Sequence, residues 1–162
     1  MSQELPTRRT RARWIVRIVM LAVVVYGVWQ LFGLHVNDPP RPATPAQAHA
    51  YTRVALPPGA RNIGVAGYRQ WIEFAQYVRF EAPADACLKY AAAVAPGAAL
   101  QPVDEFQLEL DARPIREGVL KDFEWFDLAK AKNVVRAGGT PGQMARVWVD
   151  QDRGVFYFRK TD

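Results

Sequence analysis

The sequence predicts an α+β protein in which one N-terminal transmembrane helix precedes a small domain with an antiparallel sheet of two hairpins and one packed helix. Three observations predict this. An apolar run extends from Trp14 to Val36, a proline-rich stretch follows it, and the remaining residues alternate between strand-like and helix-like apolar patterns. The 162 residues therefore divide into a basic tail (1–13), a transmembrane helix (14–36), a linker (37–50) and an extracytoplasmic domain (51–162).

The apolar run predicts a membrane span because of its length. It is interrupted only by Arg17, Gln30 and His35. From residue 18 to its end, at about 1.5 Å per residue, it is nearly as long as the roughly 30 Å hydrocarbon core of a bilayer. A cleaved signal peptide is the alternative, but the run is longer than a signal core and no small-residue cleavage site directly follows it. We therefore expect an uncleaved anchor.

Charge at the start of the chain predicts the orientation of this anchor. The formal charge is +5 with a pI near 9.6. Five arginines within residues 8–17 stand against Glu4, a net of +4, so the remaining 16 basic and 15 acidic residues carry only +1. Arginines beside a span stay in the cytoplasm. We expect a single-pass protein of the bacterial cytoplasmic membrane with its domain outside, the lipid bilayer as one partner, and no nucleic-acid partner.

One face of the predicted span suggests a contact with another helix. Gly27 and Gln30 lie on this face, where a small residue permits close approach and an amide can hydrogen-bond to a protein partner in the membrane or envelope. The alternative is that Gln30 reaches water at the membrane interface. After the span, four prolines within residues 37–48 predict an extended spacer.

The patterns of the domain predict two hairpins, a further strand and two helices. Gly154 supplies the left-handed residue of the second hairpin turn, and Cys87 is expected to be a small buried residue of the longer helix. Phe106, Leu108 and Leu110 alternate with polar residues and predict a strand. The predicted elements are strands 61–65 and 71–81, helix 83–95, a short helix 128–133 capped by Asp127, and strands 146–149 and 155–159.

The sequence contains few residues of the types that usually act in catalysis or bind metals. Ser2 is the only serine, and the two histidines have no partners at metal-ligand spacing. The acidic pairs Asp104–Glu105 and Asp150–Asp152 lie in predicted loops, where we expect them to be solvated. The sequence therefore predicts no catalytic residues, no cofactor and no metal, and a protein that is not an enzyme.

Aromatic residues are the remaining candidates for recognition. Trp125, Phe126 and Trp148 are predicted to bind a ligand or partner if they are exposed, and to cover the core if they are not. Both faces of the last hairpin are apolar, which predicts either a helix over each face or a partner on one of them.

Three segments resemble an uncharacterised family of small bacterial extracytoplasmic proteins with a membrane anchor or a lipoprotein signal. These segments are LPPGARNIG (56–64), VRFEAP (78–83) and RVWVDQDRGVFYF (146–158). The resemblance implies location but no transferable function. The leading hypothesis is a non-enzymatic, membrane-anchored accessory or interaction subunit of a larger membrane complex. The alternatives are an envelope module that binds a glycan, peptide or lipid through exposed aromatics, and an envelope hydrolase.

Overall fold

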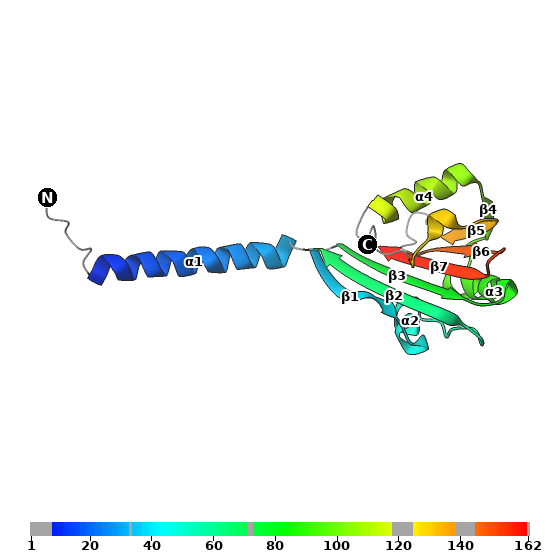
Figure 1. Cartoon of the computed structure of the whole chain (residues 1–162), viewed down its shortest axis with the longest axis horizontal. Helices are drawn as coiled ribbons and strands as arrows, with labels where there is room; N and C mark the ends of the chain where they lie inside the picture. The colour runs from blue at the N-terminus through cyan, green and yellow to red at the C-terminus, as the bar shows by residue number, and fades with distance from the viewer. Residues whose placement is uncertain (1–7, 33, 71–72, 118–124, 139–144, 162) are drawn as a thin grey trace.

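The protein has an α+β fold built on one antiparallel sheet (Figure 1). The computed structural model describes residues 8–32, 34–70, 73–117, 125–138 and 145–161. Its elements are α1 (Arg8–Phe32), β1 (Leu34–Pro42), α2 (Pro45–Thr52), β2 (Arg61–Gln70), β3 (Glu73–Glu81), α3 (Ala84–Val94), β4 (Gln101–Val103), α4 (Glu105–Glu117), the 3₁₀ turn η1 (Leu128–Lys130), β5 (Val134–Gly138), β6 (Ala145–Asp150) and β7 (Val155–Thr161).

The described strands form a seven-stranded sheet in the order β1-β2-β3-β7-β6-β5-β4, and every neighbouring pair is antiparallel. Both predicted hairpins are present, as β2–β3 and β6–β7. The prediction that they make up the whole sheet is wrong, because β1 extends the sheet beyond β2 while β5 and β4 extend it beyond β6. Hairpin signals in a sequence report only pairs of strands that are close along the chain.

The proline-rich stretch, predicted to be an extended spacer, supplies part of the edge strand β1 and leads into α2. Its register with β2 shifts between Asp38 and Arg41, where Pro39 and Pro40 lie. Prolines are tolerated there because an edge strand needs backbone donors on one side only. Thr44 then caps α2, since its hydroxyl accepts from the Gln47 backbone N–H and the Gln47 side chain accepts from the Thr44 backbone N–H.

The predicted strand around residues 106–110 is wrong, because this segment belongs to helix α4. Asp104 precedes the helix and accepts a hydrogen bond from the Gln107 backbone N–H at 2.7 Å. Leu108, Ala112 and Ile115 are buried at helical spacing, whereas Phe106 is exposed. A short apolar alternation fits a strand and a helix equally well, and the spacing that decides appears only farther along the chain.

Both faces of the sheet carry a hydrophobic core. α4 and η1 cover one face, where Tyr77, Trp148 and Tyr157 are buried, while α2 and α3 cover the other, where Val78, Phe80 and Phe156 are buried. Neighbouring residues of one strand therefore enter opposite cores, as the alternating pattern of β3 predicts. Cys87 lies fully buried in the second core, which confirms its predicted role.

The turn between β6 and β7 is partly as predicted. Gly154 has φ +63°, and a Cβ there would lie 2.3 Å from the Ala82 carbonyl oxygen, so both conformation and space require glycine. Asp150 is not solvated, contrary to the prediction. It is fully buried and accepts hydrogen bonds from the backbone N–H groups of Lys132 (3.2 Å) and Arg153 (3.1 Å).

Helix α1 extends away from the sheet (Figure 1). It ends at Phe32, and residues 34–36, predicted to belong to the span, lie in β1 instead. Its described side chains run from Trp14 to Gln30, about 25 Å at 1.5 Å per residue. In the part of the chain that the structure describes, no helix combines the length and apolar character needed to cross a membrane. The predicted transmembrane helix is therefore wrong for these residues.

Candidate functional site

A cluster of charged side chains lies at one end of the sheet, on the face that α4 covers. Its centre is Arg79 of β3, whose side chain is only 11% exposed. The guanidinium Nη2 lies 3.0 Å from Glu81 on the same strand, and its Nε lies 3.6 Å from Asp127. Arg79 reaches this position because it alternates with Phe80, which points into the opposite core.

Asp127 links the cluster to the core. It lies at the N-cap position of η1, as predicted, but its side chain makes no capping hydrogen bond, because the carboxylate binds other side chains. Tyr157 donates its phenolic hydrogen to Asp127 at 2.7 Å, and Arg153 donates at 2.6 Å. Burial opposes ionisation of Asp127, but these hydrogen bonds and the charges of Arg153 and Arg79 outweigh it and lower the pKa of the carboxyl.

Glu81 is the second carboxylate of the cluster. Asn62 donates to it at 2.8 Å, and the Arg61 guanidinium lies 3.5 Å away. Burial raises the pKa of Glu81, but the hydrogen bonds from Asn62 and Arg79 and the neighbouring positive charges lower it overall. Both carboxylates are therefore ionised at neutral pH, so neither is prepared to donate a proton.

Beside this cluster lies a hollow of about 550 Å³ between the end of β1, the start of β2 and Trp125. Asn62 has φ +48°, and the register of β2 with β3 shifts between Arg61 and Gly64. The Trp125 ring lies directly over Gly64, since a Cβ there would be 2.7 Å from Cε3 of the ring. The lining residues are Pro42, Ala43, Asn62, Ile63, Gly64, Arg79 and Trp125.

Two nitrogen donors that belong to the lining residues are unsatisfied. The indole Nε1 of Trp125 and the Nε of Arg79 are buried and have no hydrogen-bond acceptor among the residues described. A buried donor without an acceptor costs about 1–3 kcal/mol. Neither nitrogen is open to solvent, and the Nε of Arg79 faces Asp127 at 3.6 Å, so the surface that the described residues present to the hollow is mainly apolar.

A second hollow, of about 520 Å³, lies on the other side of Glu81, between the start of α3 and the turn from β6 to β7. Arg61, Glu81 and Arg153 contribute to its lining. The charged cluster thus separates the two hollows, and two of its guanidinium groups face the second one.

The structure brings together two of the three predicted aromatic site residues. The rings of Trp125 and Phe126 meet edge to face with centroids 5.7 Å apart, and Phe126 also packs on Tyr77 and Tyr157. Trp125 lines the hollow, whereas Phe126 supports it from the core. Trp148 lies elsewhere, fully buried, and donates its indole hydrogen to Asp111 at 3.0 Å.

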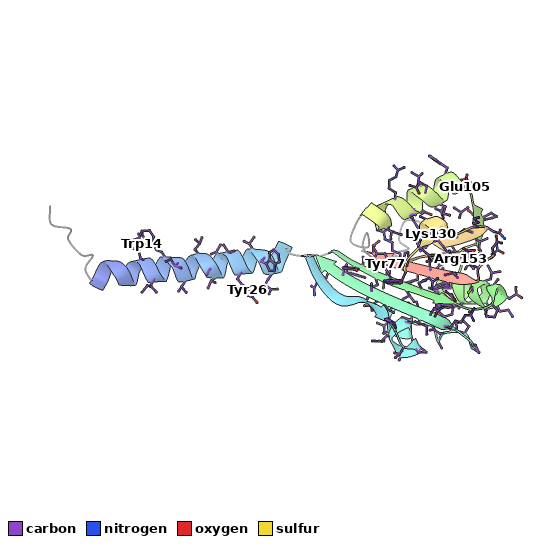
Figure 2. All side chains as sticks on the ribbon, in the orientation of Figure 1. Trp14, Tyr26, Tyr77, Glu105, Lys130 and Arg153 are labelled. Carbon is purple, nitrogen blue, oxygen red and sulfur yellow. The ribbon has the colours of Figure 1, made fainter. Side chains whose placement is uncertain are left out.

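The other predicted site residues, Gly27 and Gln30, lie on α1 at a distance from the cluster. A Cβ built at Gly27 has nothing within 4 Å, and Gln30 donates from its amide to the Tyr26 hydroxyl at 2.7 Å. Figure 2 shows the side chains of α1, including Trp14 and Tyr26, projecting from the helix on all sides. This face is therefore open to a partner.

The sequence patterns did not predict that Arg79, Asn62 and Gly64 belong to a candidate site. The one signal was that Arg79 and Glu81 stand two residues apart on the strand face that also carries Tyr77, so that opposite charges lie beside an aromatic ring. Its carboxylate partner Asp127 comes from a distant segment, which local patterns do not reveal. Over the described residues, no three or more His, Cys, Asp and Glu side chains are grouped to hold a metal ion.

Comparison with known proteins gives no match to a family model, to a curated protein or to a solved structure.

Proposed function

We propose that this chain is a non-enzymatic interaction protein that joins a larger assembly by burying helix α1 against a protein partner. The observation that carries the proposal is the exposure of α1. Its large apolar side chains from Trp14 to Trp29 are each 51–65% exposed. An exposed apolar surface of this kind is unfavourable in water and marks a site of association.

The arrangement of these side chains supports association on more than one side of the helix. Trp14, Ile15 and Val16 are consecutive and all exposed, so the apolar surface is not confined to one stripe. A helix that is apolar all round is stable when it is buried on several sides. A partner that supplies one or more apolar helices meets this requirement.

Tyr26, Gly27 and Gln30 give the helix a distinctive face. At about 100° per residue, the three lie within about 100° of arc. Gly27 leaves a flat position where a second helix can approach closely, and the hydrogen bond between Tyr26 and Gln30 fixes a polar pair beside it. We therefore assign the closest helix–helix contact to this face, where a larger side chain at residue 27 would interfere most.

The test is co-purification of the full chain in mild detergent, with Gly27→Leu and Gln30→Leu as the variants. Val25→Leu is the matched control, because it adds the same side chain to the opposite side of α1. A partner of fixed stoichiometry that is lost with Gly27→Leu and kept with Val25→Leu supports the proposal. A chain that stays monomeric, or that binds protein-free phospholipid vesicles equally in all variants, contradicts it.

A second candidate function is ligand binding by the domain, favoured by the hollow beside Trp125. The hollow falls within the roughly 300–1,000 Å³ range of ligand pockets and combines apolar walls with a few polar groups. A ligand that enters should change tryptophan fluorescence, and Trp125→Ala should abolish the change. A fluorescence response that survives in Trp125→Ala contradicts binding in this hollow.

A further inference from the structure

We propose that α1 pairs with α1 of a second copy of this chain, and that the two helices run antiparallel. The proposal rests on the proposed function, association through α1, and names the partner. The contact is centred on the face that carries Gly27, which Val16 of the partner subunit covers. Three features of α1 support this pairing: the spacing of the residues on that face, the distribution of charge along the helix, and the helix dipole.

The Gly27 face of α1 carries a continuous apolar stripe. Val16, Met20 and Val23 belong to it, because at about 100° per residue all three lie within about 40° of Gly27. Their side chains are 61–62% exposed, and a Cβ at Gly27 would have nothing within 4 Å. Since α1 extends away from the sheet (Figure 1), a second helix can lie alongside it and cover the stripe.

The spacing of the stripe matches an antiparallel copy of itself. Val16, Met20, Val23 and Gly27 are separated by four, three and four positions, so the spacing is the same when it is read from either end. When two such helices run antiparallel, Val16 lies opposite Gly27 and Met20 lies opposite Val23. Each layer then places a larger side chain against a smaller one, which permits close packing. The stripe is therefore self-complementary, as a two-fold dimer requires.

The distribution of charge opposes a parallel pair. Residues 8–17 include five arginines and no acidic residue. Two parallel helices would bring all of these positive charges together at one end, where they repel. In the antiparallel pair the two basic segments lie about 27 Å apart at 1.5 Å per residue, well beyond the Debye length of about 8 Å at physiological ionic strength. The antiparallel direction therefore removes the repulsion.

The dipole of α1 favours the same direction. The helix has no acidic residue in its first turn and no basic residue in its last turn, so neither end of its dipole is compensated by its own side chains. In the antiparallel pair, residues 11–32 of the two helices overlap, and the basic start of each helix lies beside the carbonyl end of the other. Cations near a helix C-terminus are stabilising. Position 13, an arginine, lies at the level of Gln30, whose amide oxygen suits a guanidinium donor.

The pair leaves the opposite side of each α1 for the rest of the assembly. Ile18, Val25 and Trp29 lie on that side, within about 20° of the direction opposite to Gly27, and are 60–65% exposed. A second copy therefore buries one stripe of the helix, and a further apolar partner can bury the other.

Cross-linking of cysteine variants tests both the partner and the direction. Val16→Cys and Gly27→Cys are made separately in the full chain, purified in mild detergent, and oxidised alone and after equimolar mixing. In the antiparallel pair, position 16 of one helix is about 16 Å from position 16 of the other, whereas a disulfide needs Cα atoms within about 7 Å. We expect disulfide-linked dimers only in the mixture. The unsubstituted chain is the control and should give none, because Cys87 is buried.

Sedimentation in the same detergent measures the strength of the pair. Gly27→Leu fills the flat site opposite Val16 in both halves of the dimer. It should raise the Kd of the dimer at least about 10-fold, through overpacking at two equivalent contacts. Val25→Leu, on the opposite side of α1, should leave the Kd unchanged. Circular dichroism checks that each variant keeps its helix content.

The outcomes separate the identity of the partner from association through α1. Cross-linking of each cysteine variant alone shows a parallel pair, which overturns the inference but keeps α1 as the interface. A purified chain that is monomeric, but that co-purifies with a different protein unless it carries Gly27→Leu, has the same meaning. A dimer that Gly27→Leu leaves unchanged and that gives no cross-link in any sample forms through another surface and overturns both. A chain that associates with nothing also overturns both.

Discussion

The ring of Trp125 lies so close to Gly64 that a Cβ at residue 64 would be 2.7 Å from Cε3 and 3.0 Å from Cζ3 of the indole. Phe126 meets this ring edge to face, and its partners Tyr77 and Tyr157 are buried. The indole therefore has little freedom to withdraw. Gly64→Ala should destabilise the domain by about 1–3 kcal/mol, the usual cost of overpacking, measured by urea unfolding.

Gly27→Ala is the matched control for this prediction. A Cβ at Gly27 meets nothing within 4 Å, and alanine favours a helix interior over glycine by roughly 0.5–1 kcal/mol. The two substitutions should therefore have opposite effects, destabilising the sheet at residue 64 and stabilising α1 at residue 27. A Gly64→Ala domain as stable as the wild type would show that the ring moves freely.

Acid should weaken the domain through Asp127. Its pKa in the folded chain is lowered from the ordinary 3.8, so the folded state favours the ionised form. The stability that this contributes is fully present well above the ordinary pKa of 3.8 and is lost as the pH falls through the lower pKa of the folded chain. Glu81, with its pKa lowered from 4.5, acts in the same direction.

The variant Asp127→Asn separates the contribution of Asp127. It should cost about 2–3 kcal/mol at neutral pH, because Tyr157 and Arg153 lose a charged acceptor. It should also flatten the loss of stability as the pH falls below the ordinary pKa of 3.8, which urea unfolding at a series of acidic pH values measures. An unchanged slope would mean that other carboxylates dominate acid unfolding.

How much of the fold the sequence predicts depends on how local each signal is. The turn at Gly154 and the helix that contains Cys87 follow from residues that are close along the chain, and both were predicted correctly. The strand β1 was missed because prolines argue against a strand unless it lies at an edge, and edge position depends on the whole sheet. α4 was missed because the apolar alternation over residues 106–110 was given more weight than the longer helical spacing of Leu108, Ala112 and Ile115.

The candidate site was only partly predictable for the same reason. Trp125 was identified because aromatic residues cluster there, but a cluster does not show which ring lines a hollow and which supports it. Trp148 was also predicted to bind a ligand or partner because it is aromatic, yet its side chain is fully buried beside Asp111. Arg79 becomes notable only when Asp127, 48 positions along the chain, is placed beside it.

Asp111 of α4 should be a stabilising residue of the first core. It is buried and accepts hydrogen bonds from Arg136 (2.8 Å), Arg146 (2.9 Å) and the indole of Trp148 (3.0 Å). Asp111→Ala leaves two arginines and a buried donor without their acceptor, which should cost about 3–5 kcal/mol. Near-ultraviolet circular dichroism should show altered packing of Trp148.

The control for Asp111 lies on the same helix. Glu109 and Arg113 form an ion pair of 3.9 Å between exposed side chains. Glu109→Gln should therefore change the free energy of unfolding by less than about 0.5 kcal/mol. If both substitutions have equally small effects, the Asp111 cluster does not hold α4 on the sheet.

Cys87 should report global unfolding rather than react in the native state. Its side chain is fully buried, and burial raises the pKa of the thiol to about 11. The thiol donates a weak hydrogen bond to the Ala82 carbonyl oxygen at 3.6 Å. Since the thiolate is the reactive form, both access and ionisation oppose reaction at neutral pH. A thiol reagent should label the native chain slowly, at a rate that rises with urea in parallel with loss of the sheet signal. Rapid labelling without denaturant would show that α3 opens locally from the second core.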